Sequence, residues 1–427
     1  MRAIGLDFGT TNTVAALVNS SAQAETIRFG QGEEAVRAFR SVISFWREQE
    51  SGSLLTEGGP WAIEHFVDFP GETRFLQSFK TFAASPLFDT TAIFGKRLRF
   101  ENILEAFFRT ALRHGGEALA NLPKTLVLGR PVKFAGQNAD SETAKVRYEA
   151  AFAPFGFERI VHVLEPVAAA YYYAQRLTKS ANILVGDFGG GTSDFSVLRF
   201  EGAGGDFRAF PLAHAGVGLA GDTFDYRIID AMISPKLGKG SLYESWGKRL
   251  TIPAHYFTAF AKWNEMCLMK HSSAMRELKL LAKQACEPDK LDTFIELIEW
   301  DAIYSLYAAV SRVKMQLSDK PEAELVFRDG GIDISATIRR ADFEGWIKPD
   351  LERIETCIAE ALRQARLDYG AVDKVFLTGG TSFVPAVRRI FERLFGADRV
   401  ETGDELLAVA SGLALIGQDA DISRWEA

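Results

Sequence analysis

Two similar segments constrain the fold of this chain more than any other feature of its sequence. Residues 6–17 read LDFGTTNTVAAL and residues 186–198 read GDFGGGTSDFSVL. Each segment contains an apolar strand, the triplet Asp-Phe-Gly, a turn bearing Gly and Thr, and a second apolar strand. A repeat separated by about 180 residues indicates a duplicated domain and not a solenoid of short units.

The sequence after each copy supports this interpretation. Apolar strands are expected at residues 125–129 and 375–378, and helices at residues 167–173, after Pro166, and 385–395. Alternation of strands with helices is typical of α/β architecture. We therefore expect a first lobe over residues 1–178 and a second lobe over residues 179–427.

Each lobe also contains a segment that looks like an inserted subdomain. Residues 27–98 mix short strand-like runs with turns, whereas residues 232–305 are rich in predicted helix. The second segment carries Trp246, Trp263 and Trp300. Because buried aromatic residues are more frequent than exposed ligand platforms, we expect these tryptophans to belong to the core.

Composition excludes several classes of protein. The 427 residues include 49 basic and 56 acidic side chains, a net charge of −7 that argues against general nucleic-acid binding. Three distant cysteines (Cys267, Cys286 and Cys357) and the absence of HExxH argue against a disulfide framework and a zinc site. No apolar run is long enough for a membrane helix, and no signal-peptide core is present. We expect a cytoplasmic protein with no membrane partner.

The two hairpins indicate the chemistry. Turns of Gly and Thr expose N–H groups and hydroxyls that can cradle an anion, and Asp7 and Asp187 place a carboxylate beside each turn. A glycine turn can simply close a hairpin, but two copies with matching acids favour a polyphosphate bridged by Mg²⁺, held through water. The chain has no P-loop motif. A literal GxGxxG at residues 216–221 is interpreted as a chance match, because residues 235–240 look like a loop and not a second strand.

Seven spans occur in the order of the ATPase domain of DnaK-type heat-shock chaperones: LDFGTTNT, LEPVAAA, GDFGGGTSDFSVL, LAGDTFD, VKMQLS, LTGGTSFVP and GDELLAVASGLAL. The chain thus resembles the heat shock protein 70 family over nearly its whole length, and LVLGRPVKFAG looks most like the short chaperone-like proteins of the YegD type. The resemblance implies an actin-like ATPase fold of two duplicated lobes, with ATP or ADP and Mg²⁺ in the cleft between them.

The resemblance also assigns roles to residues. The catalytic group would be Lys80, Glu165, Asp187, Thr192 and Asp194. The first phosphate loop would be Asp7, Gly9, Thr10, Thr11 and Asn12, and the second would include Gly189, Gly190 and Gly191. The metal would be held by Asp7 and Asp187. Residues around the nucleoside would be Gly221, Asp222, Lys314, Met315, Ser318, Gly379, Gly380, Thr381, Phe383 and Asp404.

The chemistry of phosphoryl transfer to water fits these residue types. Lys80 would place positive charge at the γ-phosphate, and Glu165, Asp187 or Asp194 would accept a hydrogen bond from the attacking water. On sequence alone Lys80 could be a solvated surface lysine, and Glu165 a plain acid at a helix N-terminus. We expect a slowly ATP-hydrolysing, chaperone-like protein. A nucleotide-gated interaction module with negligible turnover and a small-molecule kinase are the alternatives.

The chain departs from the family at three places. Only residues 418–427 follow the last motif, so we expect no peptide-binding domain. The arginine that relays nucleotide state to that domain has no counterpart in residues 132–138. Met315 and Phe383 stand where the family has two arginines around the adenine, and Ser311 where it has a glutamate. We therefore expect weaker nucleotide binding and reduced purine discrimination.

Overall fold

The computed structural model describes every residue except 1–2, 33–34, 70, 135–137, 176, 178, 204–205, 262–268, 271, 301 and 402–406. The described chain divides into two compact units, each considered separately below. The first comprises Met1–Gly218, Glu355–Ser382 and Ile390–Ala427, and the second comprises Leu219–Ile354 and Phe383–Arg389. These units are defined by packing, so the division into lobes at residue 178 stays a prediction.

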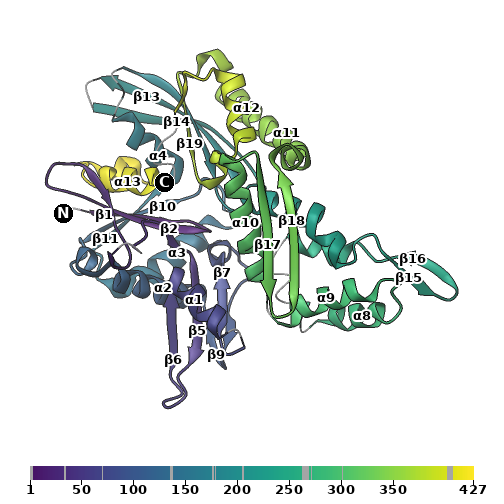
Figure 1. Cartoon of the computed structure of the whole chain (residues 1–427). Helices are drawn as coiled ribbons and strands as arrows, with labels where there is room; N and C mark the ends of the chain where they lie inside the picture. The colour runs from purple at the N-terminus through teal and green to yellow at the C-terminus, as the bar shows by residue number, and fades with distance from the viewer. Residues whose placement is uncertain are drawn as a thin grey trace. The chain divides into compact units, whose positions relative to one another are not determined.

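The first unit contains two mixed sheets with related topology (Figure 1). One has the order β11-β10-β1-β2-β3, with β4 also paired to β2, and the other has the order β14-β13-β12-β19-β20. In each sheet one strand, β1 or β12, pairs antiparallel with the strand that follows it and parallel with a later strand, β10 or β19. The duplication predicted from the sequence is therefore confirmed at the level of strand pairing.

These strands have the following bounds. In the first sheet they are β1 (Ala3–Phe8), β2 (Asn12–Val18), β3 (Ala24–Thr26), β4 (Phe39–Arg40), β10 (Thr125–Arg130) and β11 (Arg159–Leu164). In the second they are β12 (Ala181–Phe188), β13 (Ser193–Ala203), β14 (Asp206–Val217), β19 (Lys374–Thr378) and β20 (Val400–Glu401). Four consecutive residues of β10, Leu126 to Gly129, are buried, as expected for a central parallel strand covered on both faces.

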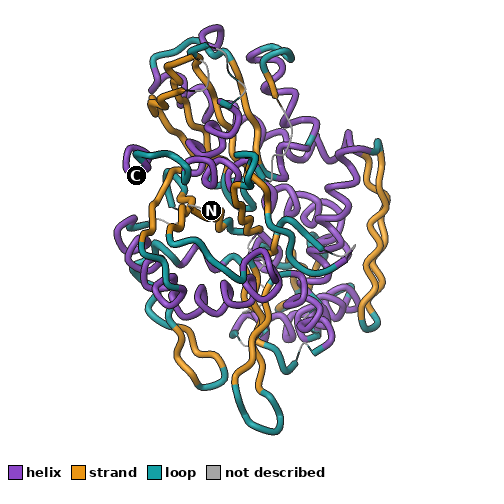
Figure 2. Tube along the Cα trace, turned by 90° about the vertical axis from the view of Figure 1, so that its left-hand side faces the viewer, coloured by secondary structure: helices purple, strands orange, loops and turns teal. Residues whose placement is uncertain are grey.

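Helices cover both sheets, and helices and strands intermix along the trace (Figure 2). Those of the first unit include α1 (Pro60–Asp68), α2 (Phe100–Gly115), α3 (Ser141–Phe152), α4 (Glu165–Ala174) and α13 (Ala408–Ile416). In α2, Phe100, Ile103, Leu104, Phe107 and Phe108 are buried, which is the spacing of one helix face. Helix α13 packs against α4, β1 and β2. The ring of Tyr173 on α4 stacks on Phe376 of β19 with centroids 4.0 Å apart, which joins α4 to the second sheet.

The inserted segment at residues 27–98 has the predicted mixed character. It forms the sheet β6-β5-β7 and the hairpin β8-β9, with bounds β5 (Val42–Arg47), β6 (Leu54–Gly58), β7 (Arg74–Gln77), β8 (Thr91–Ile93) and β9 (Lys96–Leu98). A single 3₁₀ turn, η2 (Phe79–Phe82), follows β7. This turn carries Lys80.

The second unit contains helices and two hairpins. Its helices include α5 (Gly221–Ile228), α6 (His255–Thr258), α8 (Ser273–Ala282), α9 (Pro288–Glu299) and α10 (Ile303–Asp319), and its hairpins are β15 (Leu242–Ser245) with β16 (Lys248–Thr251) and β17 (Glu322–Asp329) with β18 (Ile332–Arg339). Two further helices, α11 (Arg340–Ala365) and α12 (Pro385–Phe395), contribute residues to both units. Among the described helices, none is both long and apolar enough to cross a membrane.

The expectation for the tryptophans of residues 232–305 is wrong in part. Trp246 is 99% exposed at the tip of the β15–β16 hairpin, and Trp300 is 45% exposed. Trp300 covers the backbone of Gly330, where an added Cβ would lie 2.6 Å from the indole. Trp263 lies outside the described residues. Because apolar content alone does not distinguish an exposed hairpin tip from a core position, the aromatic spacing was misleading.

Candidate functional site

The first predicted phosphate loop is the turn between β1 and β2. The N–H of Gly9 donates to the carbonyl of Asn12 over 3.0 Å. A Cβ on Gly9 would lie 2.4 Å from that carbonyl oxygen, so the tight turn requires glycine. The turn is anchored laterally, because Ser41 donates its N–H to the carbonyl of Thr11. Thr10 and Thr11 are partly exposed, which leaves their hydroxyls accessible to a ligand.

The second predicted loop, between β12 and β13, repeats this geometry. The N–H of Gly189 donates to the carbonyl of Thr192 over 2.9 Å, and Asp187 pairs in register with Asp194. Gly191 has open space around the position of a Cβ. The two turns are therefore closed by the same hydrogen bond, from the glycine after Asp-Phe to the residue three positions later. Each presents a carboxylate, Asp7 or Asp187, on the strand that leads into the turn.

Residues 379–381 lie beside the second loop. Strand β19 is parallel to β12, with Thr378 opposite Asp187, so the turn Gly379–Gly380 follows at the same sheet edge. Gly379 has φ +85°, and an added Cβ would lie 2.0 Å from the carbonyl oxygen of Phe188. Only glycine fits both constraints. Thr381 is buried in the 3₁₀ turn that follows.

Lys80 and Glu165 meet although they are far apart in sequence. The Nζ of Lys80 donates to Oε1 of Glu165 over 2.8 Å, and the two residues are only 8% and 7% exposed. Ser78, at φ +54°, turns the chain into the 3₁₀ turn that carries Lys80. Glu165 is the first residue of α4, with Pro166 in the first helical turn, as predicted. The interpretation of Lys80 as a solvated surface lysine is therefore wrong.

The carboxylates around this ion pair have raised pKa values. Burial, with a contribution from Glu165, raises the pKa of Asp7 to about 7, although Lys80 opposes the shift. Burial, followed by the charges of Glu165, Asp7 and Asp194, raises the pKa of Asp187 well above its usual range. Burial also raises the pKa of Asp194 to about 6, against a hydrogen bond from Thr192. Fully ionised, the group would carry more negative charge than its surroundings stabilise.

Lys80 remains charged in this group. Burial alone would lower the pKa of its ammonium, but the charges of Glu165 and Asp7 outweigh that effect and raise the pKa. One ammonium faces four carboxyl groups, and a bound divalent cation would relieve the imbalance. Among the described side chains, no three or more His, Cys, Asp or Glu residues lie close enough together to ligate a metal directly.

His214, which the sequence did not single out, belongs to the surroundings of this group. Oδ1 of Asp194 lies 3.7 Å from Nε2 of His214 on β14, and Nδ1 of His214 lies 3.2 Å from Oγ of Ser196. A Cβ on Gly216 would lie 2.4 Å from the same Asp194 oxygen, so the glycine makes room for the carboxylate. These contacts come from the pairing of β13 with β14, which is antiparallel. The GxGxxG match is thus not a dinucleotide fingerprint, which needs a parallel βαβ unit.

Arg147 holds the segment that carries Lys80. Its Nη1 donates to the carbonyls of Phe82, Ala83 and Ser85 over 2.7, 3.1 and 2.9 Å, and its Nη2 donates to the carbonyl of Phe88. One guanidinium on α3 thereby satisfies four carbonyls of an otherwise irregular loop. No motif in the sequence links residue 147 to Lys80, so this connection could not be predicted.

The second unit brings together part of the predicted nucleoside group. The Nζ of Lys314 on α10 donates to the carbonyl of Gly221 over 3.0 Å and to Oδ2 of Asp225 over 2.9 Å. Asp225 is the last residue of LAGDTFD and was not selected from the sequence. Asp222 is exposed in the first turn of α5, and Ser318 is partly buried one turn after Lys314. Asp404 lies outside the described residues.

The two residues that replace the family's arginines are exposed. Met315 on α10 is 61% exposed and Phe383 is 51% exposed. Neither side chain is therefore turned into the core. Both are accessible to a planar ring.

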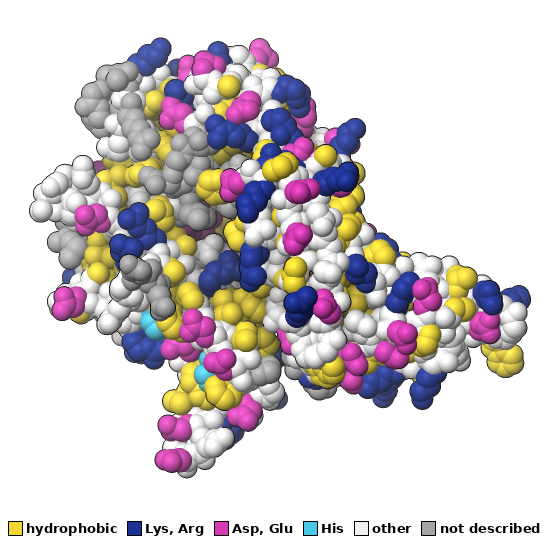
Figure 3. All heavy atoms as spheres, viewed as in Figure 1, with side chains coloured by type: hydrophobic (Ala, Val, Ile, Leu, Met, Phe, Trp, Pro, Cys, Tyr) yellow, Lys and Arg dark blue, Asp and Glu magenta, His cyan; other side chains and the backbone are white. Residues whose placement is uncertain are grey.

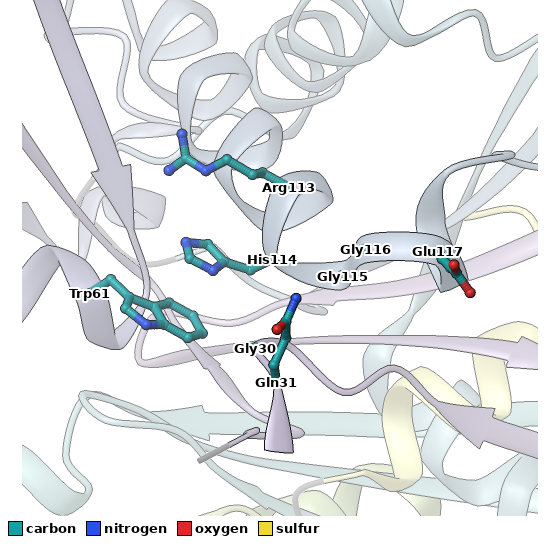
Figure 4. Close-up of a pocket in the computed structure, with 8 residues that line it drawn as sticks. All are labelled: Gly30, Gln31, Trp61, Arg113, His114, Gly115, Gly116 and Glu117. Carbon is teal, nitrogen blue, oxygen red and sulfur yellow. The ribbon is translucent and has the colours of Figure 1, made fainter. Parts of the chain in front are cut away.

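A separate cavity of about 510 Å³ lies in the first unit (Figure 4). It is lined by Gly30, Gln31, Trp61, Arg113, His114, Gly115, Gly116 and Glu117, none of which belongs to the predicted site. The rings of Trp61 and His114 stack 3.6 Å apart, and His114 Nε2 lies 2.9 Å from Glu57 Oε1. These side chains satisfy one another, so the cavity is interpreted as a fold feature.

Comparison with known proteins adds independent information. A family model described as Hsp70 protein matches residues 138–239 and 281–420. The chain is 26% identical to Chaperone protein DnaK of Picrophilus torridus, over 97% of this chain and 57% of the relative. It is 26% identical to Chaperone protein DnaK of Mycoplasmopsis agalactiae, over 98% of this chain and 60% of the relative. It is 24% identical to the chloroplastic stromal 70 kDa heat shock-related protein of Pisum sativum, over 99% of this chain and 54% of the relative.

The chain therefore spans a little over half the length of these curated relatives. The matched residues cover more than half of the chain and include the second phosphate loop, the Lys314 helix and the turn at Gly379. Together with the duplicated α/β sheets, this shows that the chain has the actin-like ATPase fold and belongs to the Hsp70 protein family.

Proposed function

We propose that this chain binds ATP or ADP with Mg²⁺ and hydrolyses ATP slowly, as a chaperone-like protein of the DnaK type. The buried ion pair between Lys80 and Glu165 carries this proposal. Both residues were assigned to catalysis from separate motifs, and they lie 85 positions apart in the sequence. A buried pair is costly unless it has a role in structure or function, and neighbouring perturbed carboxylates are typical of functional sites.

The two hairpins would hold the phosphates. Their glycine turns offer backbone N–H groups and threonine hydroxyls, which bind anions without a charged side chain. Asp7 and Asp187 would hold Mg²⁺ through its waters, since carboxylate oxygens and retained waters are its usual ligands. Burial and neighbouring acids raise the pKa of both carboxyl groups, and a bound cation would stabilise their charged forms, which supports this role. When bound, the metal supplies charge neutralisation to the phosphates.

Lys80 and the acids would organise the reaction. The ammonium of Lys80 places positive charge where the γ-phosphate develops negative charge, which is the main need of phosphoryl transfer. Glu165 and Asp194 would each accept a hydrogen bond from the attacking water and so orient it. Because Lys80 already donates to Glu165, its remaining N–H bonds would serve the phosphate.

The nucleoside would be recognised by the residues that the sequence resemblance assigns to it. Lys314 donates hydrogen bonds to Gly221 and Asp225. Ser318 and Met315 lie on the same helix and would contact the nucleoside. Phe383 would stack on the base, and Gly379, Gly380, Thr381 and Asp404 would complete the group. A cytoplasmic location and a client or co-chaperone partner also belong to this proposal. The word chaperone in the name of the DnaK relatives suggests the partner, whereas the location rests on the sequence, and the Pisum sativum relative is chloroplastic.

Phosphate release from Mg·ATP by purified protein tests the proposal. Lys80→Ala should lower turnover more than about tenfold, roughly 1.4 kcal/mol in barrier, while ADP still binds. Lys124→Ala is the matched control, because Lys124 is a 70% exposed lysine of the same unit paired with Glu158. Thermal melting of each variant shows whether removal of Lys80 has unfolded the protein.

Unchanged turnover in Lys80→Ala would remove Lys80 from the mechanism. Nucleotide binding without measurable phosphate release in the wild type would instead support the nucleotide-gated interaction module. Transfer of phosphate to a small acceptor at a rate above release to water would support the kinase alternative.

A further inference from the structure

The β15–β16 hairpin is not explained by the proposed function. The family model matches residues 138–239 and 281–420, so the hairpin lies in the interval that it leaves unmatched. Within the second unit the hairpin extends beyond α8 and α9 (Figure 1). None of its residues belongs to the phosphate or nucleoside groups. A well-formed exposed element of this kind requires a separate explanation.

The hairpin has one closed edge and one open edge. On the closed edge, Glu244 donates its N–H to Gln284 and Leu242 accepts from Cys286, so residues 284–286 continue the sheet. Among the described residues, β16 pairs with β15 alone, and all four of its residues are exposed. The sheet can therefore be extended only at β16.

The alternation of hydrogen bonds identifies the free groups on β16. In an antiparallel ladder, residues that do not bond inward direct their N–H and C=O outward. Glu244 and Leu242 point away from β16, and their register partners are Arg249 and Thr251. The peptide groups of Arg249 and Thr251 therefore point away from β15, to the open edge. Together they offer two donors and two acceptors to an added strand.

The tip adds an apolar anchor in a fixed position. Trp246 and Gly247 both have positive φ, +51° and +72°. Two such residues form the tight two-residue turn that matches the twist of a hairpin. The indole of Trp246 is 99% exposed. Tryptophan presented on a rigid element is frequent among the residues that dominate binding energy at interfaces.

The charges of the edge select the partner. Lys248 and Arg249 are both exposed on β16, and Arg249 shares a 3.3 Å ion pair with a 62% exposed Glu244. Hydrophobic and basic side chains lie together at the end of this hairpin (Figure 3). Basic residues on an edge strand disfavour pairing with a second copy of the same edge. They favour a strand that carries carboxylates.

We propose that the open edge of β16 binds an extended acidic segment of another protein by strand addition. The peptide groups of Arg249 and Thr251 would bond the added backbone, Lys248 and Arg249 would pair with its carboxylates, and Trp246 would cover an apolar residue. Strand addition of this kind draws affinity from backbone hydrogen bonds and specificity from alternate side chains.

A phage-displayed library of random twelve-residue peptides, selected on the full-length protein, tests the proposal. We expect selected peptides to carry an apolar residue flanked by Asp or Glu. Their affinity for the protein should fall at least about tenfold in the variant Trp246→Ala. It should fall as much in the double variant that combines Lys248→Glu and Arg249→Glu. Thr251→Pro should cause a similar loss, because it removes an outward N–H while the inward bonds of β16 remain.

Lys236→Glu is the control, since it changes the charge of an exposed lysine of the same unit away from the hairpin. Melting curves that match the wild type show that each variant folds. No enrichment, or equal binding to wild type and Thr251→Pro, overturns strand addition. Binding of phosphatidylserine vesicles that is lost in Trp246→Ala would overturn the protein partner in favour of a lipid surface. Dimerisation of the wild type that is lost in Trp246→Ala would overturn the protein partner in favour of a second copy of this chain.

Discussion

Single residues define the proposed site, and several of them could be predicted from the sequence. Lys80 and Glu165 were each predicted from a motif, and the structure brings them within 2.8 Å. Arg147, His214 and Asp225 were not predicted, because their contacts depend on pairings between segments distant in the chain. Motifs identify residues whose type is constrained by chemistry, whereas supporting residues are constrained only by the neighbours that folding provides.

His162 on β11 provides a pH test of the first unit. Burial, with the charges of Lys145 and Arg130, lowers the pKa of His162 to about 4, below its ordinary value of 6.5. In the unfolded chain His162 therefore binds a proton near pH 6.5, whereas in the folded protein it binds one only near pH 4. The stabilisation from neutral His162 is complete above pH 6.5 and is lost as pH falls to 4, by about 3 kcal/mol.

We expect His162→Gln to melt with a weaker dependence on pH between 6.5 and 4 than the wild type. Melting temperature measured across this range at constant ionic strength checks the prediction. His255→Gln serves as the control, because His255 is exposed on α6. A variant whose melting temperature falls with pH as steeply as that of the wild type would show that His162 is not responsible.

In the proposed function, base recognition would also depend on single residues. Met315 and Phe383 are 61% and 51% exposed and carry no charge, so cation–π attraction to a base is lost while stacking remains. We expect ATP and GTP to bind with affinities within about tenfold, or 1.4 kcal/mol, of each other. Phe383→Arg should tighten ATP binding by about threefold to tenfold. Calorimetric titration of ATP, GTP and ADP measures both effects.

The result can contradict this account in two ways. A strong preference for adenine in the wild type would mean that other groups discriminate the purine. No gain in Phe383→Arg, with Met315→Arg as the companion variant, would mean that neither position contacts the base.

At the scale of elements, α13 is positioned by backbone contacts that are so close that only glycine fits. An added Cβ on Gly412 would lie 1.8 Å from the carbonyl oxygen of Ala168 on α4. On the opposite face, a Cβ on Gly5 of β1 would lie 2.4 Å from the backbone nitrogen of Ala414. The helix therefore touches a strand and a helix of the first unit at van der Waals distance. Such contacts transmit any displacement because packed interiors are nearly incompressible.

We expect Gly412→Ala to destabilise the first unit by about 3 kcal/mol, since the new methyl group must displace a backbone. Hydrogen exchange of α4 and α13 amides would rise in this variant. Gly370→Ala is the control within the same unit, because no atom lies within 4 Å of its added Cβ. Equal exchange in the two variants would show that the helix pair relaxes without cost.

At the scale of the whole molecule, the duplicated sheets were predictable because a repeat in sequence imposes a repeat in strand pairing. The expected strand at 125–129 is observed as β10 (Thr125–Arg130), and the expected helix at 385–395 as α12. The β15–β16 hairpin was not expected within residues 232–305, which were predicted to be rich in helix. Short polar strands such as Lys248–Thr251 have no periodicity that separates them from loops.

The contact of Arg147 with the loop of Lys80 has a consequence for cooperativity. Four carbonyls of residues 82–88 accept from one guanidinium, so its displacement would remove all four hydrogen bonds together. Loss of this one side chain would therefore release the segment that follows Lys80 at several points at once. The position of Lys80 therefore depends on the folding of α3, a helix that carries none of the residues predicted for catalysis.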